Sequence, residues 1–215
     1  MPIPTELAEI WQFLHNEVAW LHGRWTMYRQ LYGTSPERIE LLNQLAPTFF
    51  GTIQAVQVDE IQLTLSRLGD PAGTGKRRNL TLETLLQEIE ALGIDGLAAE
   101  LRPLLLRFRE TCEGIAERRN KVIAHNDFQT RQPGANAIAG ASREEIEGAL
   151  DALRVFMRAV YAFFEGSHMA YEHFAMIDDA NSLLWAAKEA LRYRELTDAG
   201  TIDAGDIARS AYWMA

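Results

Sequence analysis

The chain has 215 residues, of which 47% are hydrophobic, and it carries a formal net charge of −9. This length suits one domain, with or without an appendage, and the apolar content is ample for a sizeable core. The acidic balance excludes general binding to duplex DNA, which requires a basic surface, but it leaves room for a small basic pocket.

Neither a membrane span nor a disulfide framework is expected. No segment approaches the roughly 18 consecutive apolar residues that a membrane-spanning helix needs. The N-terminus also lacks the basic and apolar stretch of a secretory signal. The single cysteine, Cys112, lies on an apolar helical stripe, so we expect it in the core of a protein of the reducing cytoplasm.

A helical pattern begins close to the N-terminus and continues past the middle of the chain. From Leu7 to Tyr28, apolar residues alternate at spacings of four and three, which predicts a helix with one buried face that ends at Gly33. Ser35 and Pro36 then form a typical helix start. We expect this second helix to continue to Leu65 or Leu68, with a kink or interruption at Pro47.

The second half of the chain alternates loops and helices. The clearest loop, Gly69–Gly75, precedes a helix capped by Thr81 and ending near Gly93. A longer helix is expected from about Ile94 to about Ala124. After a loop at 132–136, Ser142 and Glu145 form a capping box for a helix that runs to about Glu165, and Ala180–Leu196 is a further helix.

These elements predict an all-α fold, an antiparallel bundle of about six helices. We expect one domain over residues 1–196. The tail, residues 197–215, is expected to dock through Tyr212, Trp213 and Met214. No alternating strand pattern occurs, and Gly73-Thr74-Gly75 follows no strand, so a Rossmann or P-loop phosphate site is not expected.

The stretch from Glu117 to Asp127 concentrates the chemistry of the chain. Arginine can hold a phosphate and histidine can move a proton, and RNA cleavage needs both. On an ideal helix, Arg119 and His125 flank Val122 on the inward face, whereas Arg118 is an outward or C-terminal charge. Six residues separate Arg119 from His125, so they project about 120° apart with a rise of ~9 Å. The two can converge only if the helix breaks before His125 or if a second copy supplies the partner across a two-fold axis.

A purely structural interpretation is the alternative. Arg118, Lys121 and His125 can stabilise a helix C-terminus through the helix dipole, by about 0.3–1 kcal/mol each. Arg119 does not fit this interpretation, because an arginine on an apolar stripe needs a partner or a ligand. Glu113 and Glu117 are the candidate structural partners.

The segment Arg119-Asn120-Lys121-Val122-Ile123-Ala124-His125-Asn126-Asp127 resembles the signature of the HEPN superfamily, an arginine and a polar residue followed by a histidine. Its form is similar to the AbiU-like branch from abortive phage infection. The segments Leu65–Asp70 and Asn79–Leu82 resemble that branch as well, so the resemblance extends over most of residues 5–195.

The resemblance implies a helical bundle that dimerises through its motif helices, and a metal-independent ribonuclease of a phage-defence or toxin–antitoxin system. Arg119 would bind the scissile phosphate, and His125 would transfer a proton or position the ribose 2′-OH. Asn120 would be the polar support of the site, Lys121 an auxiliary phosphate contact and Asp127 a residue that orients His125. Arg118 would bind the substrate if it, and not Arg119, is the functional arginine. The product would be a 2′,3′-cyclic phosphate. RNA, a second copy of the chain and a cognate antitoxin protein are the implied partners, and no cofactor is implied.

Two other functions stay open, a non-catalytic helical module that binds RNA or protein, and recognition of a nucleotide in the same pocket. No His-x-x-x-His or Cys-x-x-Cys pair occurs, so no metal site is expected. Residues 102–131 hold seven Lys/Arg against four Asp/Glu, a local charge of +3 that leaves −12 elsewhere. The run Lys76-Arg77-Arg78 could extend this basic region, although we favour a solvated loop.

Overall fold

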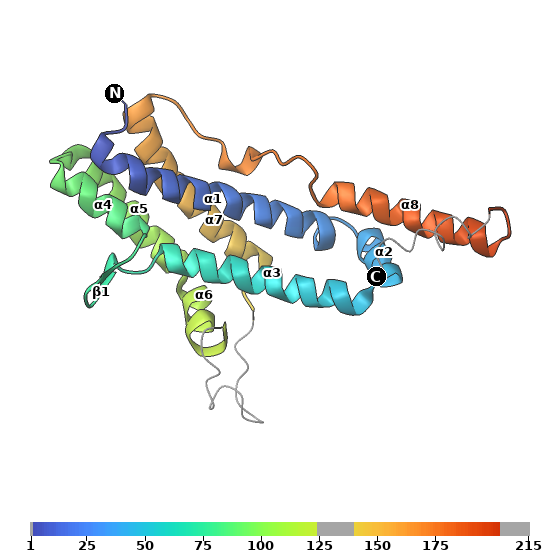
Figure 1. The fold of residues 1–215 in the computed structure, drawn as a ribbon. Helices are drawn as coiled ribbons and strands as arrows, with labels where there is room; N and C mark the ends of the chain where they lie inside the picture. Colours follow the sequence, from blue (N-terminus) through green and yellow to red (C-terminus); the bar gives the residue numbers. More distant parts are fainter. Residues whose placement is uncertain (1, 124–139, 203–215) are drawn as a thin grey trace. The chain divides into compact units, whose positions relative to one another are not determined.

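The computed structural model describes residues 2–123 and 140–202, and most of these residues are helical (Figure 1). The predicted all-α helical bundle is confirmed, although the described residues form eight α-helices instead of about six. A hairpin of two-residue strands was not expected from the sequence, because strands this short carry no periodic pattern. The elements are α1 (Thr5–Tyr32), α2 (Pro36–Leu45), α3 (Pro47–Leu68), β1 (Gly73–Thr74), β2 (Arg77–Arg78), α4 (Leu82–Ala91), α5 (Asp95–Thr111), α6 (Glu113–Arg118), the π-helix η1 (Arg119–Ile123), α7 (Arg143–Glu165), the 3-10 helix η2 (Tyr171–His173) and α8 (Ala180–Asp198).

The chain divides into two compact units. The first comprises Met1–Trp25 and Val56–Ala175, and the second comprises Thr26–Ala55 and Met176–Ala215. In the second unit α2 packs against α8, and a small apolar core forms from Leu31, Leu42, Phe50, Ala180 and Leu184.

The core of the first unit forms where α5 packs against α4 and α7. Buried apolar residues recur on these helices at spacings of three and four, so each helix turns one continuous face inward. Burying one such large side chain contributes about 1.5–3 kcal/mol. The fully buried residues include Leu85, Ile89, Leu97, Leu101, Phe108, Leu153, Phe156 and Phe164.

Helix boundaries follow the local signals in the sequence. The predicted second helix is interrupted at Ala46, one residue before Pro47, as the proline requires. Thr81 accepts a hydrogen bond from the backbone of Thr84, and Ser142 and Glu145 form the complete capping box of α7. Ser35 has the extended backbone of an N-cap but makes no side-chain capping bond.

The long helix predicted from Ile94 to Ala124 is wrong as one continuous element. It ends at Thr111, resumes as α6 after Cys112, and widens into the π-helix η1 from Arg119 onward. The hydroxyl of Thr111 donates to the Phe108 carbonyl at 2.7 Å, while the Cys112 amide is shared between the carbonyls of Phe108 and Arg109. Competition of this kind for backbone carbonyls weakens a helix locally.

No helix within the described residues is long and apolar enough to cross a membrane. The predicted loop at 132–136 and the tail residues Tyr212, Trp213 and Met214 lie outside the described ranges.

Candidate functional site

The candidate site starts at the π-helix η1, which carries the arginine of the motif. A π-helical turn is wider than an α-helical turn, and such turns occur frequently at functional sites. Here the turn follows directly after α6 and spans Arg119–Ile123. The helix geometry therefore changes within the motif, before the position of His125.

Arg119 is held by two polar side chains. Its Nη1 lies 2.6 Å from Oδ2 of Asp70, which follows the end of α3, and its Nε donates to Oδ1 of Asn120 at 3.1 Å. The Arg119 side chain is 20% exposed, so a guanidinium sits at the edge of the core with its charge balanced. The expected partners, Glu113 and Glu117, are not the residues that pair with it. No partner is recorded for Nη2 among the described residues, and a guanidinium has five donors, so donor capacity remains for a ligand.

Arg118 was predicted by the ideal-helix calculation as an outward or C-terminal charge, and it lies in the last turn of α6 but does not point outward. Its side chain is 18% exposed, and its Nη2 lies 3.1 Å from Oδ1 of Asp59 on α3. The calculation failed because it assumed one straight α-helix, whereas the helix breaks at Cys112 and widens at Arg119. Both arginines of the motif thus face carboxylates from α3 or the segment that follows it.

Lys121 and Asn120 lie on the solvent side of the turn. The Lys121 ammonium pairs with Glu117 at 2.7 Å across one helical turn, and both side chains are about half exposed. This pair stabilises the helix end as the structural interpretation expects, by about 0.3–0.5 kcal/mol.

Asp70 owes its position to Arg109 on α5. The Nε of Arg109 donates to the Gly69 carbonyl at 2.8 Å, and its Nη2 lies 3.0 Å from Oε2 of Glu83. The same Glu83 oxygen accepts from the Ala72 amide at 2.8 Å. The segment after α3 is therefore fixed to α4 and α5 on both sides of Asp70, which keeps this carboxylate in reach of Arg119.

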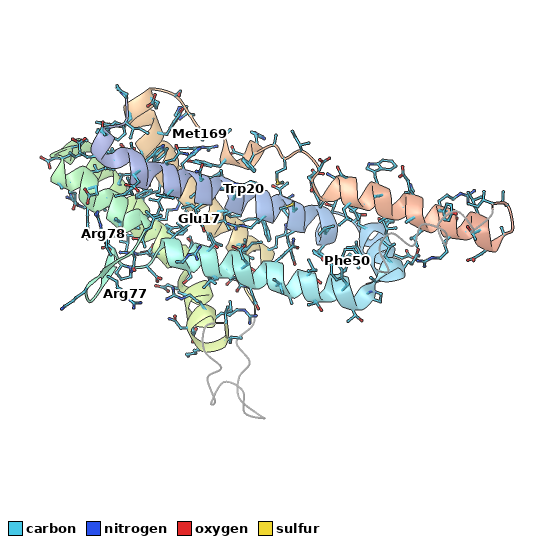
Figure 2. All side chains as sticks on the ribbon, viewed as in Figure 1. Glu17, Trp20, Phe50, Arg77, Arg78 and Met169 are labelled. Carbon is cyan, nitrogen blue, oxygen red and sulfur yellow. The ribbon has the colours of Figure 1, made fainter. Side chains whose placement is uncertain are left out.

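A pocket of about 890 Å³ opens beside Arg119, within the first unit. Its charged lining consists of Arg67, Arg77, Arg78, Arg119, Glu17 and Asp70. Figure 2 shows Arg77 and Arg78 on the hairpin and Glu17 on α1, two of the elements that line this pocket. Four arginines against two carboxylates give the lining a positive balance in a chain whose net charge is −9.

The sequence interpretation missed most of this pocket. Lys76–Arg78 is exposed, as a solvated loop would be, but Arg77 and Arg78 also line the pocket. Arg67 and Asp70 belong to the segment Leu65–Asp70 that carried the family resemblance, and this was the one available signal of their importance. His125 and Asp127 lie outside the described residues, so their expected roles stay predictions.

No group of three or more metal-ligating side chains occurs in the ranges that the structure describes. Cys112 is buried, and burial raises its thiol pKa to about 12, so it is a core residue of low reactivity.

Comparison with known families supports the resemblance seen in the sequence. The HEPN family model described as AbiU2 matches residues 4–183, which is most of the chain and includes every residue of the pocket. No curated protein and no solved structure matches the chain significantly.

Proposed function

The chain belongs to the AbiU2 family of HEPN domains, and from this membership we propose that it is a metal-independent endoribonuclease of a bacterial phage-defence or toxin–antitoxin system. It acts in the cytoplasm, with a cognate antitoxin protein as its regulatory partner. The observation that carries the proposal is Arg119, a largely buried guanidinium at a π-helical turn, oriented by Asp70 beside an arginine-lined pocket.

The proposed reaction is attack of the ribose 2′-oxygen on the adjacent phosphorus, with departure of the 5′-oxygen. His125 accepts the proton of the 2′-OH or delivers a proton to the leaving oxygen. Arg119 stabilises the extra negative charge of the pentavalent transition state through its remaining donors. The products are a 2′,3′-cyclic phosphate and a 5′-hydroxyl, and the reaction needs no metal.

Asp70 and Asn120 support this role of Arg119. Fixed hydrogen-bond donors contribute more to transition-state stabilisation than donors that must reorganise during the reaction. Two polar partners hold the guanidinium through Nη1 and Nε, and we propose that Nη2, which has no hydrogen-bond partner within residues 2–123 and 140–202, binds the phosphate. We therefore propose Arg119, rather than Arg118, as the functional arginine, because Arg119 lines the pocket whereas Arg118 is paired with Asp59 and does not line it.

Cleavage of labelled single-stranded RNA in EDTA tests the proposal. The wild-type protein should produce 2′,3′-cyclic phosphate ends, and His125→Ala should remove the activity while the circular dichroism spectrum and Tm stay unchanged. His168→Ala, which changes an exposed histidine far from the motif in the sequence, is the matched control and should cleave normally. Undiminished cleavage by His125→Ala would remove the catalytic assignment.

The proposal includes a composite site at a homodimer interface, because the family resemblance implies dimerisation through the motif helices and a two-fold axis would bring the Arg119 of one copy near the His125 of the other. Mixing the inactive variants Arg119→Ala and His125→Ala tests this arrangement. If each site takes its arginine from one protomer and its histidine from the other, an equal mixture recovers about one quarter of the wild-type activity, because half of the dimers carry one intact site. If the two variants exchange subunits but the mixture recovers no activity, Arg119 and His125 of one site belong to the same protomer.

One observation favours the alternative of a non-catalytic binding module. The charge of Arg119 is already balanced by Asp70 at 2.6 Å, as in a purely structural ion pair. Under this alternative, Arg119→Ala lowers the Tm strongly, and neither the wild-type protein nor any variant cleaves RNA.

A further inference from the structure

The pocket beside Arg119 combines positive charge with an exposed aromatic ring. Phe13 of α1 lines it and is 54% exposed, although phenylalanine in a helical bundle normally faces the core. Leu80, which follows the hairpin, lines the pocket as well and is 44% exposed, while Leu14 provides a fully buried floor. An arginine-lined pocket with an apolar wall can receive a molecule that has both a phosphate and a flat ring.

We propose that this pocket is a nucleotide subsite for single-stranded RNA, in which Phe13 stacks on an unpaired base while Arg77 and Arg67 bind the phosphates next to the scissile one. This proposal rests on the proposed ribonuclease function and assigns to it a substrate class and a second group of binding residues. The pocket has a volume of about 890 Å³, which lies in the range of small-molecule sites, roughly 300–1,000 Å³.

The pocket arginines differ in how much charge they can offer. Arg67 lies 2.6 Å from Glu17, and Arg78 is paired with Glu88. Arg77 makes no ion pair with a carboxylate within the described part of the chain. It therefore brings a positive charge that no described carboxylate balances, on a hairpin, to a pocket that contains the motif arginine.

Stacking explains why a single strand fits this pocket better than a duplex. In an RNA duplex the bases are stacked on one another, so an aromatic side chain in a pocket cannot reach their faces, whereas an unpaired base can be turned outward. Stacking on an aromatic side chain is also tolerant of sequence, since every base offers a π-face. The expected recognition is therefore of unpaired RNA with little preference for a particular base.

Binding of a fluorescent 2′-O-methyl oligoribonucleotide, which cannot be cleaved, tests the subsite separately from catalysis. Phe13→Ala should weaken binding roughly five- to 150-fold, the range expected from loss of one stacking contact. Trp20→Ala is the matched control, because Trp20 lies on the same helix, is equally exposed at 54% and does not line the pocket. It should leave the Kd unchanged.

Arg77→Ala should weaken binding and also reduce the slope of log K against log salt concentration by about 0.7, the value for one phosphate contact on a single strand. Arg192→Ala, a change of an exposed arginine on α8 that does not line the pocket, should leave the slope unchanged. A mononucleotide should compete better than inorganic phosphate, and a duplex of the same sequence should bind more weakly than the single strand.

Several outcomes would overturn the subsite. Equal Kd values for Phe13→Ala and Trp20→Ala would contradict stacking on Phe13, and an unchanged salt slope in Arg77→Ala would contradict the phosphate contact. Equal competition by inorganic phosphate and the mononucleotide, or tighter binding of the duplex than of the single strand, would also contradict the subsite.

The subsite and the ribonuclease function can fail independently of each other. A protein that binds the strand through Phe13 and Arg77 but cleaves no RNA retains the subsite and loses the nuclease assignment. A protein that cleaves RNA with KM unaffected by both substitutions loses only the subsite.

Discussion

Acidification should destabilise the fold through His22, a histidine of α1 that lies in the core. His22 is 4% exposed, and its ring stacks on that of Tyr171 with 6.0 Å between the centroids. Burial lowers its pKa from 6.5 to about 4; Arg154 and Arg158 act in the same direction, and Glu172 opposes them. The imidazole is therefore neutral in the folded protein at pH values where it is protonated in the unfolded chain.

The sign and the size follow from this difference in pKa. The folded-state pKa is the lower one, so the unfolded chain binds the additional proton, and stability falls as the pH drops below 6.5 until it levels off below about pH 4. Relative to pH 7, His22 alone should cost about 2 kcal/mol at pH 5 and about 3 kcal/mol at pH 4. A domain with a typical total of roughly 5–15 kcal/mol would lose a large share of its stability.

Urea unfolding at a series of pH values, followed by far-UV circular dichroism, measures the effect. The variant His22→Leu cannot titrate, so its stability should fall less than that of the wild type between pH 6.5 and pH 4. His168→Leu, a change of an exposed histidine, should retain the wild-type pH dependence. If the wild type and His22→Leu lose stability in parallel over this range, the reasoning about His22 is refuted. If it holds, RNA cleavage should be assayed above pH 6.

Three further predictions concern the ion pair, the cysteine and a helix cap. A double-mutant cycle with Asp70→Asn and Arg119→Met, measured by urea unfolding, should give a coupling energy of about 1–2 kcal/mol. This value lies between those of exposed and buried ion pairs. A coupling energy near zero would show that the contact does not stabilise the fold. Cys112 should react with a disulfide reagent at pH 8 much more slowly than a free thiol, because it is buried and burial raises its pKa to about 12, and rapid labelling in native buffer would contradict this. Ser142→Ala should lower the free energy of unfolding by about 1 kcal/mol, because it removes half of the capping box with Glu145, and an unchanged urea midpoint would count against that role.

Elements fixed by neighbouring residues were predicted well from the sequence. The caps at Thr81 and Ser142 and the interruption before Pro47 depend on side chains within a few residues of the helix end, so they can be recognised without the fold. The break at Cys112 could not be recognised in this way. It depends on how the Thr111 hydroxyl competes for one carbonyl, and threonine in a helix more often leaves the backbone bonds intact.

The candidate site was predicted only at its centre. Arg119 was identified because its position on an apolar stripe required a partner, and that requirement is met. The identity of the partner could not follow from spacing, since Asp70 lies 49 residues earlier in the chain and is brought to Arg119 by the fold, in which Arg109 of α5 binds the carbonyl of the neighbouring Gly69. Phe13 carried no signal at all, because one exposed phenylalanine in a helical pattern is indistinguishable from an ordinary surface residue.

The pairing of the pocket arginines sets how the proposed RNA binding would depend on charge. Arg67 and Arg119 each lie 2.6 Å from a carboxylate, so each pair brings donors in fixed positions but little net charge. When a phosphate replaces the carboxylate of such a pair, or shares the arginine with it, few counterions are released. The affinity should therefore depend on salt concentration less steeply than expected for four unpaired arginines. Net attraction would come mainly from Arg77, while the discrimination between a strand and a free phosphate would come from stacking on Phe13. If the proposed function holds, the net charge of −9 would disfavour general attraction of nucleic acid, and RNA binding would depend on this pocket.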